Sequence, residues 1–252
     1  MMKATARANT NIALIKYWGK RDEKLFLPNN SSLSLTLDSF FTTTTVKFSQ
    51  ELEKDSLQIN GASATNEEQL RVSRLLNIVR EMAGVNTHAL VTSENNVPTA
   101  AGFASSASAF AALAAASTKA LNMQLSKEEL SVLARQGSGS ACRSIYGGFV
   151  EWEKGERADG LDSKAVQLLP ENQWNITILS AVVSSERKKV SSREGMKRTV
   201  ETSPFYKGWL DTVHKDLLTA KTAIKEKDFI TLGEVMENNA LKMHGTMLGA
   251  KP

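Results

Sequence analysis

Residues 98–109, PTAAGFASSASA, decide the fold, because they join a glycine- and serine-rich turn to the alanine-rich run that we predict to be a helix over Phe103–Leu121. The N–H groups of a helix's first turn have no partners inside the helix, and the helix dipole favours negative charge there. Gly102 lets a ligand approach the backbone, and the hydroxyls of Ser105, Ser106 and Ser108 can bind phosphate or magnesium. The segment therefore predicts a phosphate-binding helix start. A serine-capped core helix, whose alanines merely allow close packing, explains this segment alone at least as well.

Composition and charge narrow the class of protein. The 252 residues are 41% hydrophobic and 23% charged, which is typical of a globular chain with one large core or two smaller ones. Net charge is only +4 and aromatic residues make up 6%, so the sequence does not favour a nucleic-acid-binding protein. Cys142 is the single cysteine, which excludes a disulfide within the chain. No apolar run approaches the ~18 residues of a membrane span, and we expect a cytoplasmic protein without a membrane partner.

Apolar periodicity predicts strands and helices that alternate irregularly. We predict strands over residues 33–37, 42–48, 56–59, 88–92, 149–152 and 174–183. We predict helices over residues 67–82, 103–121, 126–135, 205–225 and 228–243. Residues 155–173 are polar and irregular, so we place a domain boundary at their end, which divides 1–172 from 173–252. The pattern indicates an α+β protein with two lobes, and a doubly wound nucleotide fold is disfavoured because no G-x-G-x-x-G motif opens the chain.

Three further segments combine hydroxyls with cations. They are GSGSACRS at residues 137–144, KYWGKR at 16–21 and KKVSSR at 188–193. A guanidinium binds phosphate or carboxylate through two hydrogen bonds, and a lysine binds them as a point charge. Each segment alone also fits a flexible loop or a surface with solvated charges. Four such segments together, without a nucleophile paired with a histidine, indicate a site for several phosphates and hence a phosphoryl-transfer enzyme with a small anionic substrate.

The order of five segments resembles the diphosphomevalonate decarboxylase family, which belongs to the GHMP kinase superfamily. These segments are ANTNIALIKYWGKRDE (8–23), LPNNSSLSLTLD (27–38), VPTAAGFASSASAFAALAAA (97–116), RQGSGSACRSIYGGFVEW (135–152) and KKVSSREGM (188–196). The likeness covers essentially the whole chain. The Pro-x3-Gly-x-x-Ser-Ser-Ala pattern is shared across the superfamily, whereas KYWGK and GSGSACRS single out the decarboxylases. The resemblance implies a two-lobed GHMP-kinase fold with a ribosomal-protein-S5-like N-terminal domain and a ferredoxin-like C-terminal domain.

The resemblance also implies an activity and a set of roles. It implies a homodimeric lyase that uses ATP and Mg²⁺ to phosphorylate the 3-hydroxyl of mevalonate 5-diphosphate, and then releases phosphate and CO₂ to give isopentenyl diphosphate. The implied substrate-binding residues are Asn11, Tyr17, Lys20, Ser138, Ser140, Arg143, Ser192 and Arg193. The implied nucleotide-binding residues are Ser93, Glu94, Asn95, Pro98, Ala101, Gly102, Ala104, Ser105, Ser106, Ser108 and Lys188, with Ser105 and Ser106 near the metal. The implied catalytic residues are Arg143, which holds the substrate carboxylate, Ser192, and Lys188, which closes over the ATP phosphates.

The sequence departs from the family at its third motif. The family's Thr-x-Asp-Ala-Gly-Pro-Asn stretch carries the aspartate implied to act on the 3-hydroxyl, and no aspartate of this chain matches it. Its place would lie beyond Pro252, so we expect the C-terminal domain of this sequence to be incomplete. Two alternatives therefore stay open: a non-catalytic form that still binds nucleotide or diphosphate, and a related mevalonate-pathway kinase. KYWGK and GSGSACR argue against the kinase.

Overall fold

The computed structural model describes residues 2–97, 105–181 and 190–251, which form two compact units, each with its own hydrophobic core. Unit 1 contains residues 2–11, 37–97 and 105–145, and unit 2 contains residues 12–36, 146–181 and 190–251. Among the helices in these ranges, none has the length and apolarity that crossing a membrane requires. The mixture of helices and strands confirms the α+β class, whereas the predicted domain boundary at residue 172 stays a prediction.

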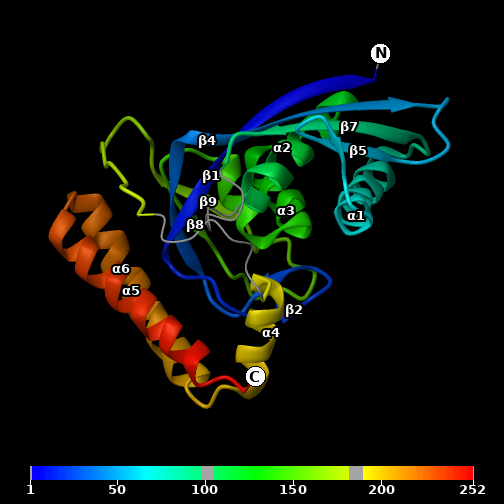
Figure 1. Cartoon of the computed structure of the whole chain (residues 1–252). Coiled ribbons are helices and arrows are strands. Elements are labelled where there is room, and N and C mark those ends of the chain that lie inside the picture. Colours follow the sequence, from blue (N-terminus) through cyan, green and yellow to red (C-terminus); the bar gives the residue numbers. More distant parts are fainter. Residues whose placement is uncertain (1, 98–104, 182–189, 252) are drawn as a thin grey trace. The chain divides into compact units, whose positions relative to one another are not determined.

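Unit 1 is built on a mixed sheet (Figure 1). Its strands are β1 (Lys3–Ile15), β4 (Ser32–Ser49), β5 (Ser56–Ile59), β6 (Ala62–Ser63) and β7 (His88–Asn95), of which β1 and β4 continue into unit 2. Strand β4 pairs antiparallel with β7 and also pairs with β1, and β7 pairs in parallel with β5. The two strands predicted over 33–37 and 42–48 are one long strand. The backbone stays extended between them because Asn9 Nδ2 donates to the Leu37 and Asp38 carbonyls and the Phe41 N–H donates to Asn96 Oδ1.

The helices of unit 1 lie together on one face of this sheet (Figure 1). They are α1 (Asn66–Ala83), α2 (Ser105–Ala120), α3 (Lys127–Gly137) and the 3-10 helix η1 (Gly139–Ile145). Local signals confirm two predicted ends: α1 stops at Gly84, which is left-handed with a φ of 65°, and Ser126 with Glu129 forms a capping box before α3. The alanines of α2 are buried on almost every side, which lets strands and helices approach it closely. The predicted start of this helix at Phe103 lies outside the described residues.

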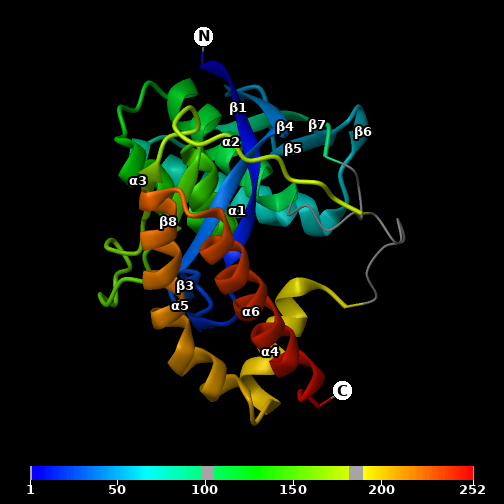
Figure 2. The same cartoon turned by 90° about the vertical axis from the view of Figure 1, so that its left-hand side faces the viewer.

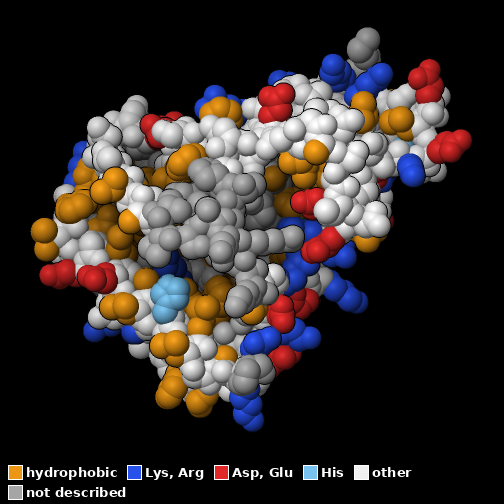
Figure 3. Space-filling model, viewed as in Figure 1, with side chains coloured by type: hydrophobic (Ala, Val, Ile, Leu, Met, Phe, Trp, Pro, Cys, Tyr) orange, Lys and Arg blue, Asp and Glu red, His pale blue; other side chains and the backbone are white. Residues whose placement is uncertain are grey.

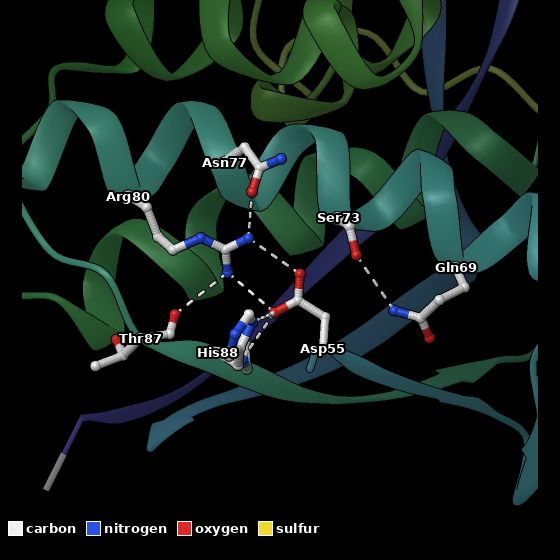
Figure 4. A network of polar contacts seen from close by, with 8 residues as sticks. Asp55, Gln69, Ser73, Asn77, Arg80, Thr87 and His88 are labelled. Atoms are coloured by element: carbon white, nitrogen blue, oxygen red, sulfur yellow. Dashed lines mark hydrogen bonds and ion pairs between the residues drawn. The ribbon is translucent and has the colours of Figure 1, made fainter. Parts of the chain in front are cut away.

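A polar network joins three elements of unit 1 at one end of the sheet (Figure 4). The Asp55 carboxylate accepts hydrogen bonds from Arg80 Nη1 at 2.9 Å and Nη2 at 3.1 Å, and from the Ala89 N–H at 2.9 Å. His88 Nδ1 lies 3.6 Å from the same carboxylate. Burial alone would raise the pKa of Asp55, but hydrogen bonds from Arg80, Ala89 and Ser73 hold it below its ordinary value.

Unit 2 combines a small set of strands with three helices. The strands are β2 (Lys20–Asp22), β3 (Leu27–Pro28), the first part of β4, β8 (Phe149–Trp152) and β9 (Ala165–Leu169). The helices are α4 (Ser192–Thr202), α5 (Tyr206–Glu226) and α6 (Phe229–Leu248). Strand β8 pairs antiparallel with β4 on one side and with β9 on the other. Helices α5 and α6 form a hairpin whose two arms lie side by side (Figures 1 and 2), and their inner faces supply Trp209, Val213, Leu217 and Leu232 to the core.

Two predictions about unit 2 are wrong. Residues 174–181, predicted as part of a buried strand, form neither helix nor strand and are largely exposed. Trp174 stacks on Phe149 with ring centroids 5.4 Å apart, so its apolar surface is covered without strand pairing. Conversely, β9 lies inside the stretch predicted to be irregular, because its antiparallel pairing with the preceding strand β8, and not an apolar pattern of its own, makes it a strand.

Candidate functional site

The 3-10 helix η1 carries a buried cluster of polar side chains. Arg143 is 2% exposed, and its Nε donates to Asn11 Oδ1 at 3.3 Å. Asn11 is also buried, and its Nδ2 donates to the Ser140 carbonyl at 3.1 Å and to Ser144 Oγ at 2.8 Å. A buried guanidinium is costly unless it is well paired, and its planar fork suits a carboxylate or phosphate. Residues 137–144 are therefore not a flexible loop, and the structure brings together the predicted partners Asn11 and Arg143.

A row of hydroxyls links the start of α2 to the end of α3. Ser106 Oγ lies 3.2 Å from Ser138 Oγ, which lies 3.5 Å from Ser140 Oγ. Ser105, the first residue of α2, is exposed, and the first turn of α2 has no acidic side chain. The positive end of the helix dipole is therefore not neutralised from within that turn. The row places hydroxyls predicted for the nucleotide beside hydroxyls predicted for the substrate.

Close helix packing fixes this arrangement. A Cβ on Gly137 would lie 2.1 Å from Phe110 Cδ1, so only glycine allows α3 to end this close to α2. Cys142 next to Arg143 is fully buried, and burial raises the pKa of its thiol to about 12, although the Arg143 and Arg135 guanidiniums act in the opposite direction. The thiol is therefore protonated at neutral pH and cannot act as a nucleophile.

Several side chains predicted to contact nucleotide are engaged within the protein. Ser93 and Ser108 are buried, and each hydroxyl lies within 3 Å of a threonine hydroxyl on β4, at 2.9 Å and 2.8 Å respectively. Asn95 Oδ1 accepts a hydrogen bond at 3.3 Å from the Thr42 hydroxyl, the same hydroxyl that contacts Ser108, and the Asn95 N–H donates to Asn60 Oδ1 at 2.8 Å. Glu94 is exposed on β7. In the structure, Ser93, Asn95 and Ser108 thus support β4, and their contact with nucleotide stays a prediction.

In unit 2, the KYWGK segment carries a buried cation. The side chain of Lys20 is only 4% exposed, its Nζ forms an ion pair with Glu23, and it lies 4.8 Å from the centre of the Phe26 ring. The guanidinium carbon of Arg193 lies 5.6 Å from the same ring. Aromatic faces attract cations, so Phe26 holds two predicted phosphate ligands that are far apart in sequence. The interpretation of Lys20 as a solvated lysine is wrong.

The neighbouring predicted residues lie in the same unit. The Tyr17 ring packs against Trp152 with centroids 4.7 Å apart. Ser192 is the exposed first residue of α4, and Ser191 before it caps the helix by accepting a hydrogen bond from the Glu194 N–H. The Ser192 hydroxyl therefore lies at a helix start, where an anion is favoured.

Sequence reasoning missed the residues that hold the KYWGK turn. The Tyr206 hydroxyl donates to the Trp18 carbonyl at 2.7 Å and accepts from Asn29 Nδ2 at 2.9 Å, and burial raises its pKa. Gly19 has a φ of 98°, and a Cβ there would lie 2.2 Å from that hydroxyl. The glycine was the local signal for this turn, whereas no local pattern connects it to Tyr206.

Five predicted residues lie outside the described ones: Pro98, Ala101, Gly102, Ala104 and Lys188. Within residues 2–97, 105–181 and 190–251, no group of three or more His, Cys, Asp and Glu side chains is arranged to hold a metal ion. The donors at the start of α2 are hydroxyl oxygens, which are ligands that Mg²⁺ accepts alongside phosphate oxygens. This donor set fits a magnesium ion that a polyphosphate brings with it.

Comparison with protein families and solved structures identifies what the chain is similar to. Residues 8–165 match the model of the diphosphomevalonate decarboxylase-like N-terminal domain, and residues 178–252 match that of the mevalonate 5-diphosphate decarboxylase C-terminal domain. The diphosphomevalonate decarboxylases of Ganoderma lucidum and Homo sapiens are 42% and 40% identical over 99% and 98% of this chain. The chain spans 66% of the length of each of these relatives.

Solved structures agree with these matches. A structure described as MDDEF in complex with MVAPP, AMPPCP and magnesium has a TM-score of 0.90 at 52% identity, over 98% of this chain and 76% of that one. The mevalonate diphosphate decarboxylase of Staphylococcus aureus has a TM-score of 0.89 at 50% identity, over 98% of this chain and 75% of that one.

Proposed function

Because the chain belongs to the diphosphomevalonate decarboxylase family, we propose that it carries out the ATP-dependent decarboxylation of mevalonate 5-diphosphate. ATP phosphorylates the 3-hydroxyl and becomes ADP. The new phosphate then leaves with its bonding electrons, because phosphate is a better leaving group than hydroxide. Its departure builds positive charge at C3, which draws the electrons of the C–CO₂ bond into the new double bond and releases CO₂ with isopentenyl diphosphate.

The observation that carries this proposal is the buried pair formed by Arg143 on η1 and Asn11 on β1. Arg143 has an always-charged planar fork in a site from which water is excluded, so it can hold the substrate carboxylate in one orientation. Asn11 fixes the guanidinium and lies beside the 3-hydroxyl. In this geometry the breaking C–CO₂ bond is held in alignment with the departing phosphate.

In unit 2, groups from the KYWGK segment and from the start of α4 bind the substrate diphosphate. Lys20 and Arg193, gathered on Phe26, supply positive charge, and Tyr17 and Ser192 supply hydroxyls. In unit 1, the resemblance to the family assigns the hydroxyls of Ser138 and Ser140 to the substrate as well. Support comes from two structures described as MDDEF in complex with MVAPP, which are 52% and 50% identical to this chain with TM-scores of 0.90 and 0.85.

The start of α2 binds the phosphates of ATP. Its first-turn N–H groups and the hydroxyls of Ser105 and Ser106 face no acidic residue within that turn, which suits a polyanion. A magnesium ion bound by the ATP phosphates would neutralise charge and orient the transferred phosphoryl group when it is present. The complex of the relative with AMPPCP and magnesium supports this assignment. The resemblance to the family further assigns Lys188 to the ATP phosphates and Glu94 to the nucleoside.

A turnover assay tests the proposal. Purified protein with ATP, magnesium and mevalonate 5-diphosphate should release phosphate and CO₂ in equal amounts. Arg143→Ala should lower turnover by at least a hundredfold, equivalent to about 3 kcal/mol, because the buried carboxylate would lose its charge partner, while the Kd for ATP should stay unchanged. Arg157→Ala is the matched control, since Arg157 is an exposed arginine that forms an ion pair with the exposed Asp159. Equal turnover of Arg143→Ala and wild-type protein would remove Arg143 from the site.

A binding form without catalysis is the second candidate function. No aspartate of residues 1–252 is assigned to act on the 3-hydroxyl, and this favours testing binding separately from turnover. Calorimetric binding of mevalonate 5-diphosphate and ATP without release of phosphate would establish the binding form. Phosphate release without CO₂ would instead indicate a kinase.

A homodimer in the cytoplasm completes the proposal. Both properties rest on the resemblance to the family, and the location is also consistent with a single, buried, unoxidised cysteine. Sedimentation equilibrium tests the assembly, since a dimer has twice the 27.5 kDa mass of the chain.

A further inference from the structure

A buried polar chain in unit 2 connects the helix hairpin to the backbone of the KYWGK segment. Asn239 on α6 is fully buried, and its Oδ1 accepts the Lys16 N–H at 2.9 Å. Its Nδ2 donates to Asp216 Oδ2 on α5 at 2.8 Å. Lys242 Nζ lies 2.9 Å and 2.6 Å from the two oxygens of Asp216. The polar chain therefore runs from Lys242, at the surface of α6, to Lys16, the first residue of KYWGK.

The polar chain determines the orientation of the Asn239 amide. Asp216 is a carboxylate and accepts hydrogen bonds only, so it must face the NH₂ group of Asn239. The carbonyl oxygen of Asn239 is then directed at the Lys16 N–H. A buried backbone N–H without an acceptor is costly, so this single oxygen holds the start of KYWGK in place.

Other side chains hold the following backbone groups. Asn30 Nδ2 donates to the Lys16 carbonyl at 2.8 Å, and the Tyr206 hydroxyl donates to the Trp18 carbonyl at 2.7 Å. The polar backbone groups on both sides of Tyr17 are thus held by side chains from outside the segment. A shift of this backbone would move the Tyr17 ring and the Lys20 ammonium together.

We propose that Asn239 is a positioning residue for substrate binding: it sets the place of Tyr17 and Lys20 by holding the Lys16 N–H, and Asp216 and Lys242 orient it. This inference rests on the proposed function, in which Tyr17 and Lys20 bind the substrate diphosphate. Asn239 itself touches no substrate in this scheme. Its effect is on affinity for mevalonate 5-diphosphate and not on affinity for ATP, which the start of α2 binds in unit 1.

An exchange of the two polar groups provides the test. In Asn239→Asp a second carboxylate faces Asp216 at hydrogen-bonding distance, and like charges this close repel, so the polar chain breaks. In the double variant Asn239→Asp with Asp216→Asn, the amide at position 216 donates to the carboxylate at position 239, which still accepts the Lys16 N–H. The link to the Lys16 N–H is restored with both side chains unchanged in size, whereas Lys242 loses its 2.6 Å contact with the oxygen that the amide nitrogen replaces and keeps the 2.9 Å contact with the other oxygen.

Calorimetric titration with mevalonate 5-diphosphate and, separately, with ATP measures the Kd of each protein for the two ligands. The Kd of Asn239→Asp for mevalonate 5-diphosphate should rise roughly tenfold, the equivalent of about one lost hydrogen bond. Its Kd for ATP should stay within about twofold, and the double variant should recover most of the lost affinity. Thermal unfolding of all three proteins shows whether each is folded at the temperature of titration.

Each outcome of these titrations either supports or overturns the positioning role of Asn239. Equal affinity of wild-type protein and Asn239→Asp for mevalonate 5-diphosphate overturns the positioning role alone. A parallel loss of both affinities, or recovery of thermal stability in the double variant without recovery of affinity, also overturns it, because both indicate a purely structural role. Failure of the wild-type protein to bind mevalonate 5-diphosphate would instead overturn the proposed function, and the positioning role with it.

Discussion

At the scale of the residue, Gly19 sets the shape of the KYWGK turn. Its φ of 98° strains any other residue, and a Cβ would lie 2.2 Å from the Tyr206 hydroxyl and 2.6 Å from Val200 Cγ2. Gly19→Ala should therefore lower the free energy of unfolding by about 3 kcal/mol, through backbone strain and displaced helix side chains. Gly61→Ala is the matched control: Gly61 has a φ of 79°, but nothing lies within 4 Å of its Cβ, so strain alone should cost about 1 kcal/mol. Urea denaturation measures both, and equal losses would contradict the steric contribution.

The same scale shows what sequence patterns can find. Residue type and local spacing were enough to select Arg143 and Lys20, and the family resemblance added Asn11. The structure shows all three side chains to be buried and engaged in polar or ionic contacts. Their supporting residues could not be selected this way. Tyr206 and Asn239 reach the KYWGK segment from helices near the other end of the chain, and nothing in their own surroundings distinguishes them from ordinary helix residues.

At the scale of the element, Asp55 ties the start of β5 to α1 and β7. Its pKa is lowered on folding, so its stabilisation is present above the unfolded pKa of about 4 and is lost as the pH falls through the lower folded pKa. Asp55→Asn should cost about 3 kcal/mol at pH 7, because the mostly buried Arg80 would lose its carboxylate. The difference from wild-type protein should shrink as the pH falls below about 4. Urea denaturation of both proteins between pH 3 and 7, a range in which carboxyl groups titrate, measures this difference in the free energy of unfolding.

The control for this prediction is Asp159→Asn. Asp159 also has a lowered pKa, about 2, because of its hydrogen bond from Arg157, but that pair is exposed and water screens it. Its removal should leave stability at pH 7 almost unchanged. A loss as large as that of Asp55→Asn would contradict the explanation from burial.

Helices whose ends are marked by capping residues were predictable, whereas strands that depend on pairing with another strand were not. Gly84 and the Ser126–Glu129 pair determine helix ends within a few residues, and both predictions were confirmed. Strand β9 depends on β8 for its pairing, and residues 174–181 lack such a partner despite their apolar pattern. A run of apolar residues indicates that side chains are buried, but not that they form a strand. Trp174 is covered by stacking on Phe149 instead.

At the scale of the whole molecule, helix α6 exposes large apolar side chains, and hydrophobic surface gathers over α5 and α6 (Figure 3). Ile230 is 68% exposed and Leu248 is 90% exposed, while the net charge of the chain is only +4. Charges at both positions should weaken self-association about tenfold or more, because two apolar contacts would be lost. Light scattering of Ile230→Lys with Leu248→Lys measures this against Leu70→Lys with Leu161→Lys, which adds the same two charges at exposed leucines outside α6. Equal effects of the two variants would show that net charge, and not this surface, controls association.

The ion pair between Lys20 and Glu23 determines how a phosphate group would enter the proposed diphosphate site. The ammonium is almost inaccessible to solvent and already has an anion from its own chain, so a ligand arrives by replacing Glu23 and not by capturing a bare cation. Such a replacement trades one negative charge for another and releases few dissolved ions, which makes the encounter less sensitive to ionic strength than at an open lysine. The displaced Glu23 is mostly exposed already, so it returns to water at little cost and leaves the lysine to the ligand.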